Sequence, residues 1–145
     1  MAISIEQAQK SDLKEIHRMI LDFATFQKTP EKVYITAEQM EADADLLKAL
    51  IVRRDEKAIG FATYYFGYSS WSGRHLYLDD IYLESDQRGK GIGDQMMDKL
   101  ELIARDNNCK SMRWLVSKWN ESAIEFYKKR GASVDGTEFT CQLNL

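Results

Sequence analysis

A glycine-rich stretch over residues 86–93 has the composition of an anion-binding loop. Its sequence, Asp-Gln-Arg-Gly-Lys-Gly-Ile-Gly, has glycine at alternating positions, so the backbone itself is free to approach another molecule. Amides turned outward at the start of a helix, with Arg88 and Lys90 beside them, would bind phosphate or pyrophosphate. An ordinary strand-to-helix loop is the alternative interpretation of this stretch taken alone.

Two adjacent carboxylates, Asp79 and Asp80, are the candidate acid–base and cation-binding groups. Neighbouring negative charges raise the pKa of one carboxyl group, which suits a general base at neutral pH. An amine nucleophile needs such a base, because a lysine-like ammonium has a pKa of about 10.4 and must first lose a proton. Alternatively, the two carboxylates only bind a cation or cap backbone amides.

The strand predicted to carry these carboxylates contains a change of phase. Leu76 and Leu78 share one parity of the strand alternation, whereas Ile81 and Leu83 share the other. Keeping all of them on one face requires an extra residue near the two aspartates, which is a β-bulge. The bulge would leave a backbone amide unpaired near Ile81, and that amide is the natural donor to an oxyanion. A central strand buried on both faces, with carboxylates at its middle, is the costlier alternative.

The other elements follow from periodicity, caps and breakers. Ser11 is the expected N-cap of the first helix, and Thr36 begins a capping box. Asn120 and Gly131 are the expected limits of the last helix. In chain order, the expected helices cover residues 12–27, a short segment from 36, 92–106 and 123–130. The expected strands cover residues 2–6, 50–52, 59–68, 75–84, 111–117 and, around an Asp-Gly hairpin signal, 133–145.

Length and composition predict one domain spanning residues 1–145. The chain is 44% hydrophobic and 30% charged, and its net charge of −3 with scattered Lys and Arg indicates no nucleic-acid partner. It has no helix-long apolar run and no signal-peptide pattern, which favours a soluble, cytoplasmic protein without a membrane partner. Its cysteines and histidines are few and far apart, so no metal site is predicted.

The order of elements resembles the GNAT superfamily of N-acetyltransferases along the whole chain. The superfamily's phosphate signature is Arg or Gln, two residues, Gly, one residue, then Gly or Ala, and it corresponds here to Arg88, Gly91 and Gly93. Residues 119–132, Trp-Asn-Glu-Ser-Ala-Ile-Glu-Phe-Tyr-Lys-Lys-Arg-Gly-Ala, are similar to its second signature. Within the superfamily the chain is particularly similar to the spermidine/spermine and thialysine acetyltransferases, over residues 60–66, 76–80 and 88–93.

The resemblance implies an α/β (α+β) fold in which a bulged central strand is splayed to hold acetyl-CoA. The implied sheet is mixed and mostly antiparallel, with about six or seven strands and about four helices. Acetyl-CoA is the implied cosubstrate, with its pyrophosphate on the loop amides and its pantetheine along residues 81–83. The implied cofactor contacts are Ile81, Tyr82, Leu83, Arg88, Gly89, Lys90, Gly91, Ile92, Gly93, Asp94, Asn120 and Tyr127.

The resemblance also implies catalytic and acceptor-binding roles. Tyr127 would protonate the departing thiolate and Asp79 would act as the general base. By itself, a tyrosine on the apolar face of the last helix is more often a core residue. The implied acceptor-binding residues are Asp79, Asp80, Trp71 and Gln27. This chain departs from the polyamine enzymes at Gln27 and Ser69, where those enzymes carry acidic residues.

With the resemblance, the sequence predicts an acetyl-CoA-dependent N-acetyltransferase that acts on a small cationic amine by direct attack in a ternary complex. A polyamine, thialysine or a lysine-like compound would be the acceptor. A protein lysine or N-terminus as the acceptor, and a non-catalytic acyl-CoA-binding module, remain alternatives. A dinucleotide fingerprint from Gly89 would need Gly or Ala at Asp94, and a P-loop would need a Gly-Lys-Ser/Thr ending. A homodimer is implied by the resemblance alone.

Overall fold

The computed structural model describes residues 2–145. These residues form two compact units, 2–114 and 115–145. The first unit holds the sheet and most of the helices, and the second contains α4 (Glu121–Lys129). A single domain over residues 1–145 stays a prediction. Among residues 2–145, no helix combines the length and the apolar character needed to cross a membrane.

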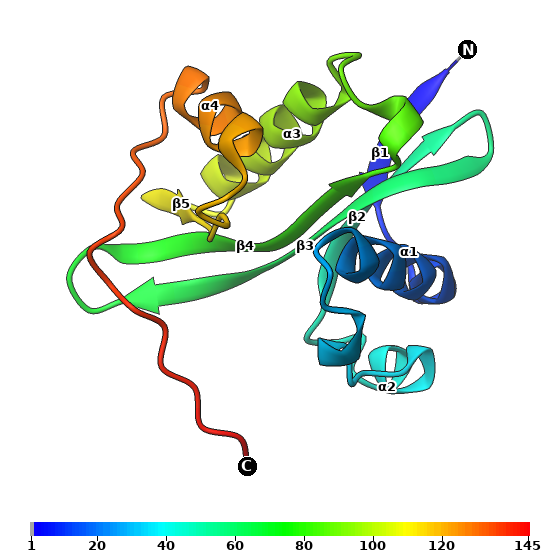
Figure 1. Ribbon diagram of the computed structural model, residues 1–145, viewed down its shortest axis with the longest axis horizontal. Helices are drawn as coiled ribbons and strands as arrows, with labels where there is room; N and C mark the ends of the chain where they lie inside the picture. The colour runs from blue at the N-terminus through cyan, green and yellow to red at the C-terminus, as the bar shows by residue number, and fades with distance from the viewer. Residues whose placement is uncertain (1) are drawn as a thin grey trace. The chain divides into compact units, whose positions relative to one another are not determined.

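One five-stranded sheet forms the centre of the first unit within the described residues (Figure 1). Its strands are β1 (Ile3–Gln7), β2 (Lys48–Arg54), β3 (Lys57–Ser69), β4 (Gly73–Leu83) and β5 (Ser111–Arg113). They lie in the order β1, β2, β3, β4, β5, and all neighbours are antiparallel except the parallel pair β4 and β5. The predicted mixed, mostly antiparallel architecture is confirmed.

Helices cover both faces of this sheet. Helices α1 (Leu13–Phe26) and α2 (Ala37–Ala42) lie on one face and α3 (Ile92–Asp106) on the other (Figure 1). Ile16 and Met19 of α1 are fully buried and belong to one apolar cluster with Phe61 of β3. The buried stripe of α3 consists of Ile92, Met96, Met97, Leu100 and Ala104. Burial of these two stripes from water holds the helices to the sheet.

The bulge predicted in β4 is confirmed at Asp79. The β3–β4 register pairs Tyr64 with Leu78 and Thr63 with Asp80, so Asp79 has no partner across the ladder. Side chains of directly opposed residues in an antiparallel pair share a face. The extra residue therefore keeps the apolar side chains before and after the bulge on one face of the sheet. These are Leu76, Leu78, Ile81 and Leu83. Asp80 is on the opposite face, which α1 covers.

Two of the predicted helix starts behave differently. At α2 the Thr36 side chain accepts the amide of Gln39 at 3.1 Å and the Gln39 side chain accepts the amide of Thr36 at 3.4 Å, so the capping box is confirmed. Ser11 as the N-cap of α1 is wrong. A 3-10 turn, η1 (Lys10–Asp12), precedes α1, and the Asp12 carboxylate accepts the amide of Gln9 at 2.8 Å. Asp12 is the residue before α1, but its side chain does not cap the helix and instead forms an ion pair with Arg53 of β2.

The second unit confirms a helix but not a strand. Asn120 accepts the amide of Ala123 at 3.3 Å at the start of α4, and Gly131 follows the helix with φ +94°. The strand predicted over 133–145 is wrong, because these residues contain no strand. Asp135 accepts the amide of Thr137 at 3.0 Å, so a local turn forms, but a stable hairpin also requires packing of its arms. The sheet therefore has five strands rather than six or seven within the described residues, and the strand predicted over 111–117 ends at residue 113.

Candidate active site

The glycine loop between η3 (Ser85–Gln87) and α3 has the backbone geometry that an anion cradle needs. Gly89 and Gly91 have φ angles of +74° and +81°, in the left-handed region that favours glycine. A Cβ atom added at either position would meet no heavy atom within 4 Å. Backbone conformation therefore requires these glycines, and the space outside the loop is open to a ligand.

The amides of this loop are available for binding. Among the described residues, no acceptor is found for the backbone amides of residues 89–93. The carbonyl of Gly91 accepts the amide of Gln95 at 3.2 Å, which begins the hydrogen-bond ladder of α3. Unpaired amides at the positive end of a helix attract anions. The loop therefore has the donors that bind a phosphate or pyrophosphate group, and its predicted contact with acetyl-CoA stays a prediction.

Arg88 fixes the loop to the sheet and to α1. Its Nε donates to the carbonyl oxygen of Leu83 at 3.0 Å, and its guanidinium carbon lies 4.8 Å from the ring centroid of Phe26. The guanidinium also lies 5.9 Å from the ring of Tyr82, which packs against Phe23 at a centroid distance of 5.6 Å. These contacts hold the Arg88 guanidinium against the end of β4 and against α1. The Tyr82 side chain belongs to the core, and its predicted cofactor contact stays a prediction.

Strand β4 has an open edge next to the loop. Strand β5 pairs with residues 75–77 alone, so within the described residues the remainder of that edge has no strand partner. Glu84 donates its amide to β3 at 2.9 Å, and main-chain groups of successive residues in a strand alternate in direction. The amides of Ile81 and Leu83 consequently point away from β3, toward the open edge. An extended ligand could pair with them there, and the pantetheine contact that the family resemblance implies for residues 81–83 stays a prediction.

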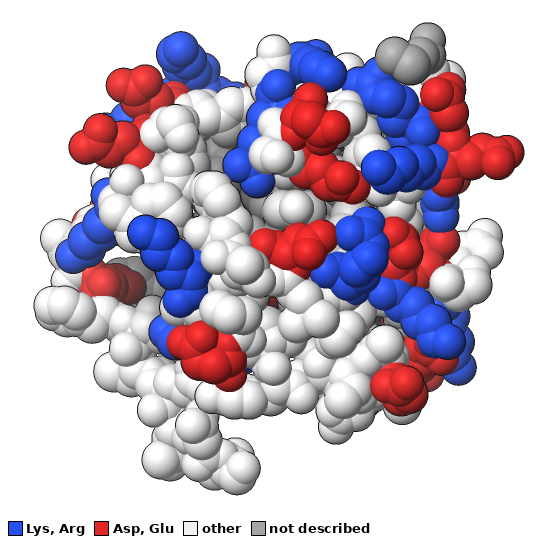
Figure 2. Space-filling model, turned by 45° about the vertical axis from the view of Figure 1, so that its right-hand side comes forward, with Lys and Arg blue, Asp and Glu red and all other residues white. Residues whose placement is uncertain are grey.

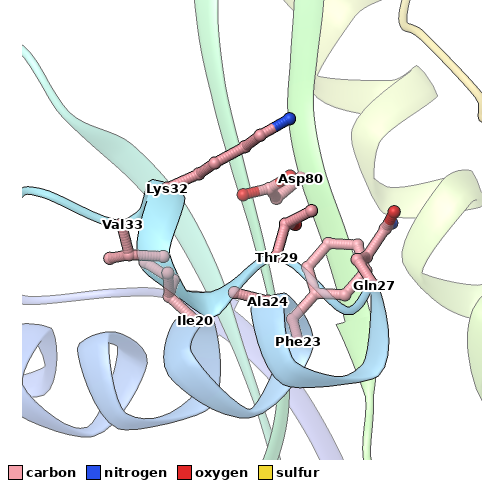
Figure 3. A pocket seen from close by; sticks show the side chains of 8 residues that line it. All are labelled: Ile20, Phe23, Ala24, Gln27, Thr29, Lys32, Val33 and Asp80. Atoms are coloured by element: carbon pink, nitrogen blue, oxygen red, sulfur yellow. The ribbon is translucent and has the colours of Figure 1, made fainter.

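A pocket of about 260 Å³ lies on the α1 side of the same part of β4 (Figure 3). Asp80 enters it from the bulged strand, and the other side chains come from α1 and the segment that follows it. The lining residues are Ile20, Phe23, Ala24, Gln27, Thr29, Lys32, Val33 and Asp80. Of the predicted acceptor residues, Asp80 and Gln27 are brought together here although they are distant in sequence. The apolar wall, Thr29 and Lys32 were missed, because nothing in their spacing indicates a cavity.

The two aspartates differ in environment. Asp80 is half-buried, and this burial, with a further contribution from the charge of Asp79, raises the pKa of its carboxyl group from the ordinary 3.8 to about 6. Asp79 is more exposed, and partial desolvation raises the pKa of its carboxyl group too. Because both pKa values are raised, both carboxylates are better proton acceptors near neutral pH than ordinary aspartates. Thr63 lies opposite Asp80, is buried, and its Oγ1 has no hydrogen-bond partner in residues 2–145.

Two predicted site residues belong to the second unit. The Asn120 side chain caps α4. Tyr127 is buried, and its ring makes an edge-to-face contact with the ring of Phe126 at a centroid distance of 5.4 Å. Burial raises the pKa of the Tyr127 hydroxyl, so the group is protonated at neutral pH. This state is the one that a proton donor requires. The predicted roles of both residues toward the cofactor stay predictions.

The structure places the last predicted residues at the surface. Trp71 lies at the turn between β3 and β4, is 98% exposed and does not line the pocket. Asp94 is exposed in the first turn of α3. On the face that Figure 2 shows, basic and acidic side chains are interspersed. Across residues 2–145, no cluster of three or more His, Cys, Asp or Glu side chains is arranged to hold a metal ion.

Replacing Gly91 with valine should weaken acetyl-CoA binding by at least about tenfold, since a β-branched side chain would occupy the approach to the loop amides. Lys90→Ala should cost about twofold to fivefold, and less at high salt, because that side chain contributes an exposed charge. Calorimetric titration of the folded variants measures both. Gly131→Val is the control for backbone strain, since Gly131 also has positive φ but lies outside the loop. Equal losses from Gly91→Val and Lys90→Ala would contradict binding by the loop backbone.

Comparison with protein families and curated proteins gives consistent matches. Residues 13–132 match the acetyltransferase (GNAT) family. The thialysine N-epsilon-acetyltransferase of Bos taurus is 34% identical over 142 residues, which cover 90% of this chain and 84% of that protein. The spermidine/spermine N(1)-acetyltransferase-like protein 1 of Homo sapiens is 34% identical over 139 residues, which cover 88% of this chain and 20% of that protein.

Comparison with solved structures shows the same fold. An aminoglycoside acetyltransferase from an uncultured soil metagenomic sample superposes with a TM-score of 0.83 at 16% identity, over 98% of this chain and 97% of that chain. An aminoglycoside N-acetyltransferase solved in complex with CoA superposes with a TM-score of 0.79 at 18% identity, over 99% and 96% of the two chains. The predicted fold class is thereby confirmed.

Proposed function

We propose, since this chain belongs to the acetyltransferase (GNAT) family, that it transfers the acetyl group of acetyl-CoA to a primary amine of a small cationic acceptor beside Asp80. The observation that carries the proposal is the position of two binding features on one segment of β4. The pocket contains Asp80 of this segment, and the open strand edge runs along the residues that follow it, 81–83. An amine in the pocket and a thioester along the edge would thus approach each other at the bulge.

Acetyl-CoA supplies its acetyl group as a thioester, so the amine nitrogen forms a C–N bond to the carbonyl carbon while the C–S bond breaks and CoA is released as a thiol. The chain provides sites for the protons and for the developing negative charge. An acceptor ammonium loses a proton to Asp79 or Asp80, directly or through water. The raised pKa of Asp80, about 6, makes it a stronger base than an ordinary aspartate.

The outward-pointing amide of Ile81 is the proposed donor to the carbonyl oxygen as that oxygen gains negative charge. The hydroxyl of Tyr127 is the proposed proton donor to the leaving sulfur. Both groups suit these roles. A main-chain amide donates a hydrogen bond at any pH, and a buried tyrosine hydroxyl stays protonated at neutral pH. After the C–N bond forms, the nitrogen gives up a second proton, which passes through water and replaces the proton that Tyr127 donates to the sulfur. The protons then balance without an acyl-enzyme, so the proposed attack is direct.

The names of the relatives support amine acceptors. Thialysine and the polyamines spermidine and spermine, which appear in those names, are small amines. Two alternatives are kept: a protein lysine or N-terminus as the acceptor, and an acyl-CoA-binding module without catalysis. A homodimer is proposed from the family resemblance, and a cytoplasmic location from the sequence pattern. Sedimentation velocity of the purified protein tests the oligomeric state.

A CoA-release assay tests the function. Purified protein is incubated with acetyl-CoA and, separately, with polyamines, lysine, thialysine, aminoglycosides and amino acids, and mass spectrometry identifies each product. Acetylation of a small amine supports the proposal. Transfer confined to added proteins or peptides would favour the macromolecular acceptor. Tight acetyl-CoA binding without transfer to any acceptor would leave the non-catalytic module.

A further inference from the structure

The acceptor pocket contains one acidic and one basic lining residue. Asp80 lies on the bulged strand, and Lys32 is the last residue of the 3-10 turn η2 (Pro30–Lys32) on the opposite side. Figure 3 shows the Lys32 side chain extending across the pocket toward the Asp80 carboxylate. Their charged groups do not form an ion pair within 4.0 Å among the described residues. Each group is therefore available to a ligand that carries the complementary charge.

This arrangement of charge is unfavourable for a polyamine. A polyamine that presents one amine to Asp80 carries its other positive charges toward the mouth of the pocket. The exposed ammonium of Lys32 would repel them, and Gln27, which also lines the pocket, is uncharged. A ligand with a cationic amine at one end and an anionic group at the other would satisfy both charges.

We propose that Lys32 binds the carboxylate of a zwitterionic acceptor, a basic amino acid whose side-chain amine lies beside Asp80. The inference rests on the proposed function and names its substrate class. The methylene chain between the two ends would lie against the apolar wall of Ile20, Phe23 and Val33. The flexible stem of a lysine lets its ammonium follow carboxylates at different distances from the amine. Lys32 is thus a specificity-determining residue that selects basic amino acids over polyamines.

The test compares acceptors that differ only at the carboxylate. L-lysine and 1,5-diaminopentane have the same amine and the same carbon chain, and lysinamide retains the α-amine but lacks the negative charge. Lys32→Gln should lower kcat/KM for L-lysine by about fivefold to tenfold, as expected for a partly exposed charge pair. The same variant should raise kcat/KM for 1,5-diaminopentane by about twofold, since a repulsive charge is removed. Lys32→Glu should reverse the preference of the wild type.

Lys28→Gln is the matched control. Lys28 is an exposed lysine that is close to Lys32 in sequence and does not line the pocket. Its replacement changes the net charge by the same amount as Lys32→Gln and should leave kcat/KM unchanged for both L-lysine and 1,5-diaminopentane. For each acceptor, the kcat/KM of the variant is divided by that of the wild type. This ratio cancels the effect of different amine pKa values among the acceptors. Calorimetric binding of L-lysine to the CoA-bound protein provides the comparison without turnover.

The two possible failures are distinguishable. Turnover of small amines with the same L-lysine to 1,5-diaminopentane ratio in wild type and Lys32→Gln would overturn the role of Lys32 and leave the proposed function intact. Equal losses for both acceptors would also overturn it, because removing a residue that attracts a carboxylate and repels a second ammonium cannot lower kcat/KM for 1,5-diaminopentane. Absence of CoA release with every amine would overturn the proposed function and this inference with it.

Discussion

Replacing Tyr127 with phenylalanine is expected to lower kcat by about 10²-fold, the lower end of the usual contribution of general acid catalysis. The lower end applies because a thiol leaving group has a pKa near 8.5 and departs readily as a thiolate. The change keeps the buried ring and its contact with Phe126. KM for the acceptor should change little, since an interaction confined to the transition state affects kcat. Steady-state kinetics at several pH values, with circular dichroism of the variant, provide the measurement.

Tyr64→Phe is the matched control for this experiment. Tyr64 is also a buried tyrosine, and its hydroxyl donates to Oε1 of Gln7 at 3.0 Å, outside the proposed machinery. Loss of this hydrogen bond should lower the free energy of unfolding by about 1 kcal/mol and leave kcat unchanged. A folded Tyr127→Phe protein with the wild-type kcat would show that Tyr127 only fills the core and that water protonates the thiolate.

The second large effect is expected at Asp80. Asp80→Asn should lower kcat/KM for a cationic acceptor by about 30- to 100-fold, as expected when one member of a half-buried charge pair is removed. The affinity for acetyl-CoA should not change, because only the acceptor carries the complementary charge. Asp55→Asn, in the exposed turn between β2 and β3, is the control for net charge. An unchanged acceptor KM together with weaker acetyl-CoA binding would assign Asp80 to the cofactor.

The raised pKa of Asp80 also predicts two pH dependences. The wild-type kcat/KM should fall as the pH drops below about 6, because the carboxylate becomes neutral and loses its attraction for the acceptor. Because the folded-state pKa lies above the ordinary value of 3.8, the folded protein binds a proton at Asp80 more tightly than the unfolded chain does. Ionisation of Asp80 therefore lowers the free energy of unfolding. This destabilisation appears as the pH rises from about 4 to about 6 and is complete above that range.

Asp80→Asn should therefore have a higher Tm than the wild type at pH 7.5, with the difference vanishing below about pH 4. Differential scanning calorimetry over this range provides the measurement. Lower stability of the variant at pH 7.5 would mean that the Asp80 carboxylate is stabilised by partners in the folded protein. The expected combination, weaker acceptor binding with greater stability, is typical of a carboxylate retained for function.

The sequence determined the features that depend on neighbouring residues along the chain. The phase change between Leu78 and Ile81 located the bulge, since side chains of a strand alternate strictly. The spacing of apolar residues located α3 from Ile92 to Asp106, and the glycines located a loop whose left-handed backbone the structure shows. These signals are local, because dihedral preferences and helical or strand periods are properties of a few consecutive residues.

The tertiary structure decided which distant residues share a site. The pocket exists because the end of α1, the segment through Lys32 and the bulge of β4 pack together, and no periodicity links residues 20–33 with Asp80. The open edge of β4 exists because β5 ends at Arg113, where the sequence predicted a longer strand, and the arms of the predicted terminal hairpin have no strand partner. The pKa of Asp80 near 6 likewise follows from desolvation, which depends on what covers the carboxylate. Residue types and spacing thus fixed the chemistry available to this chain, whereas long-range packing alone determined the pocket, its charge and its open edge.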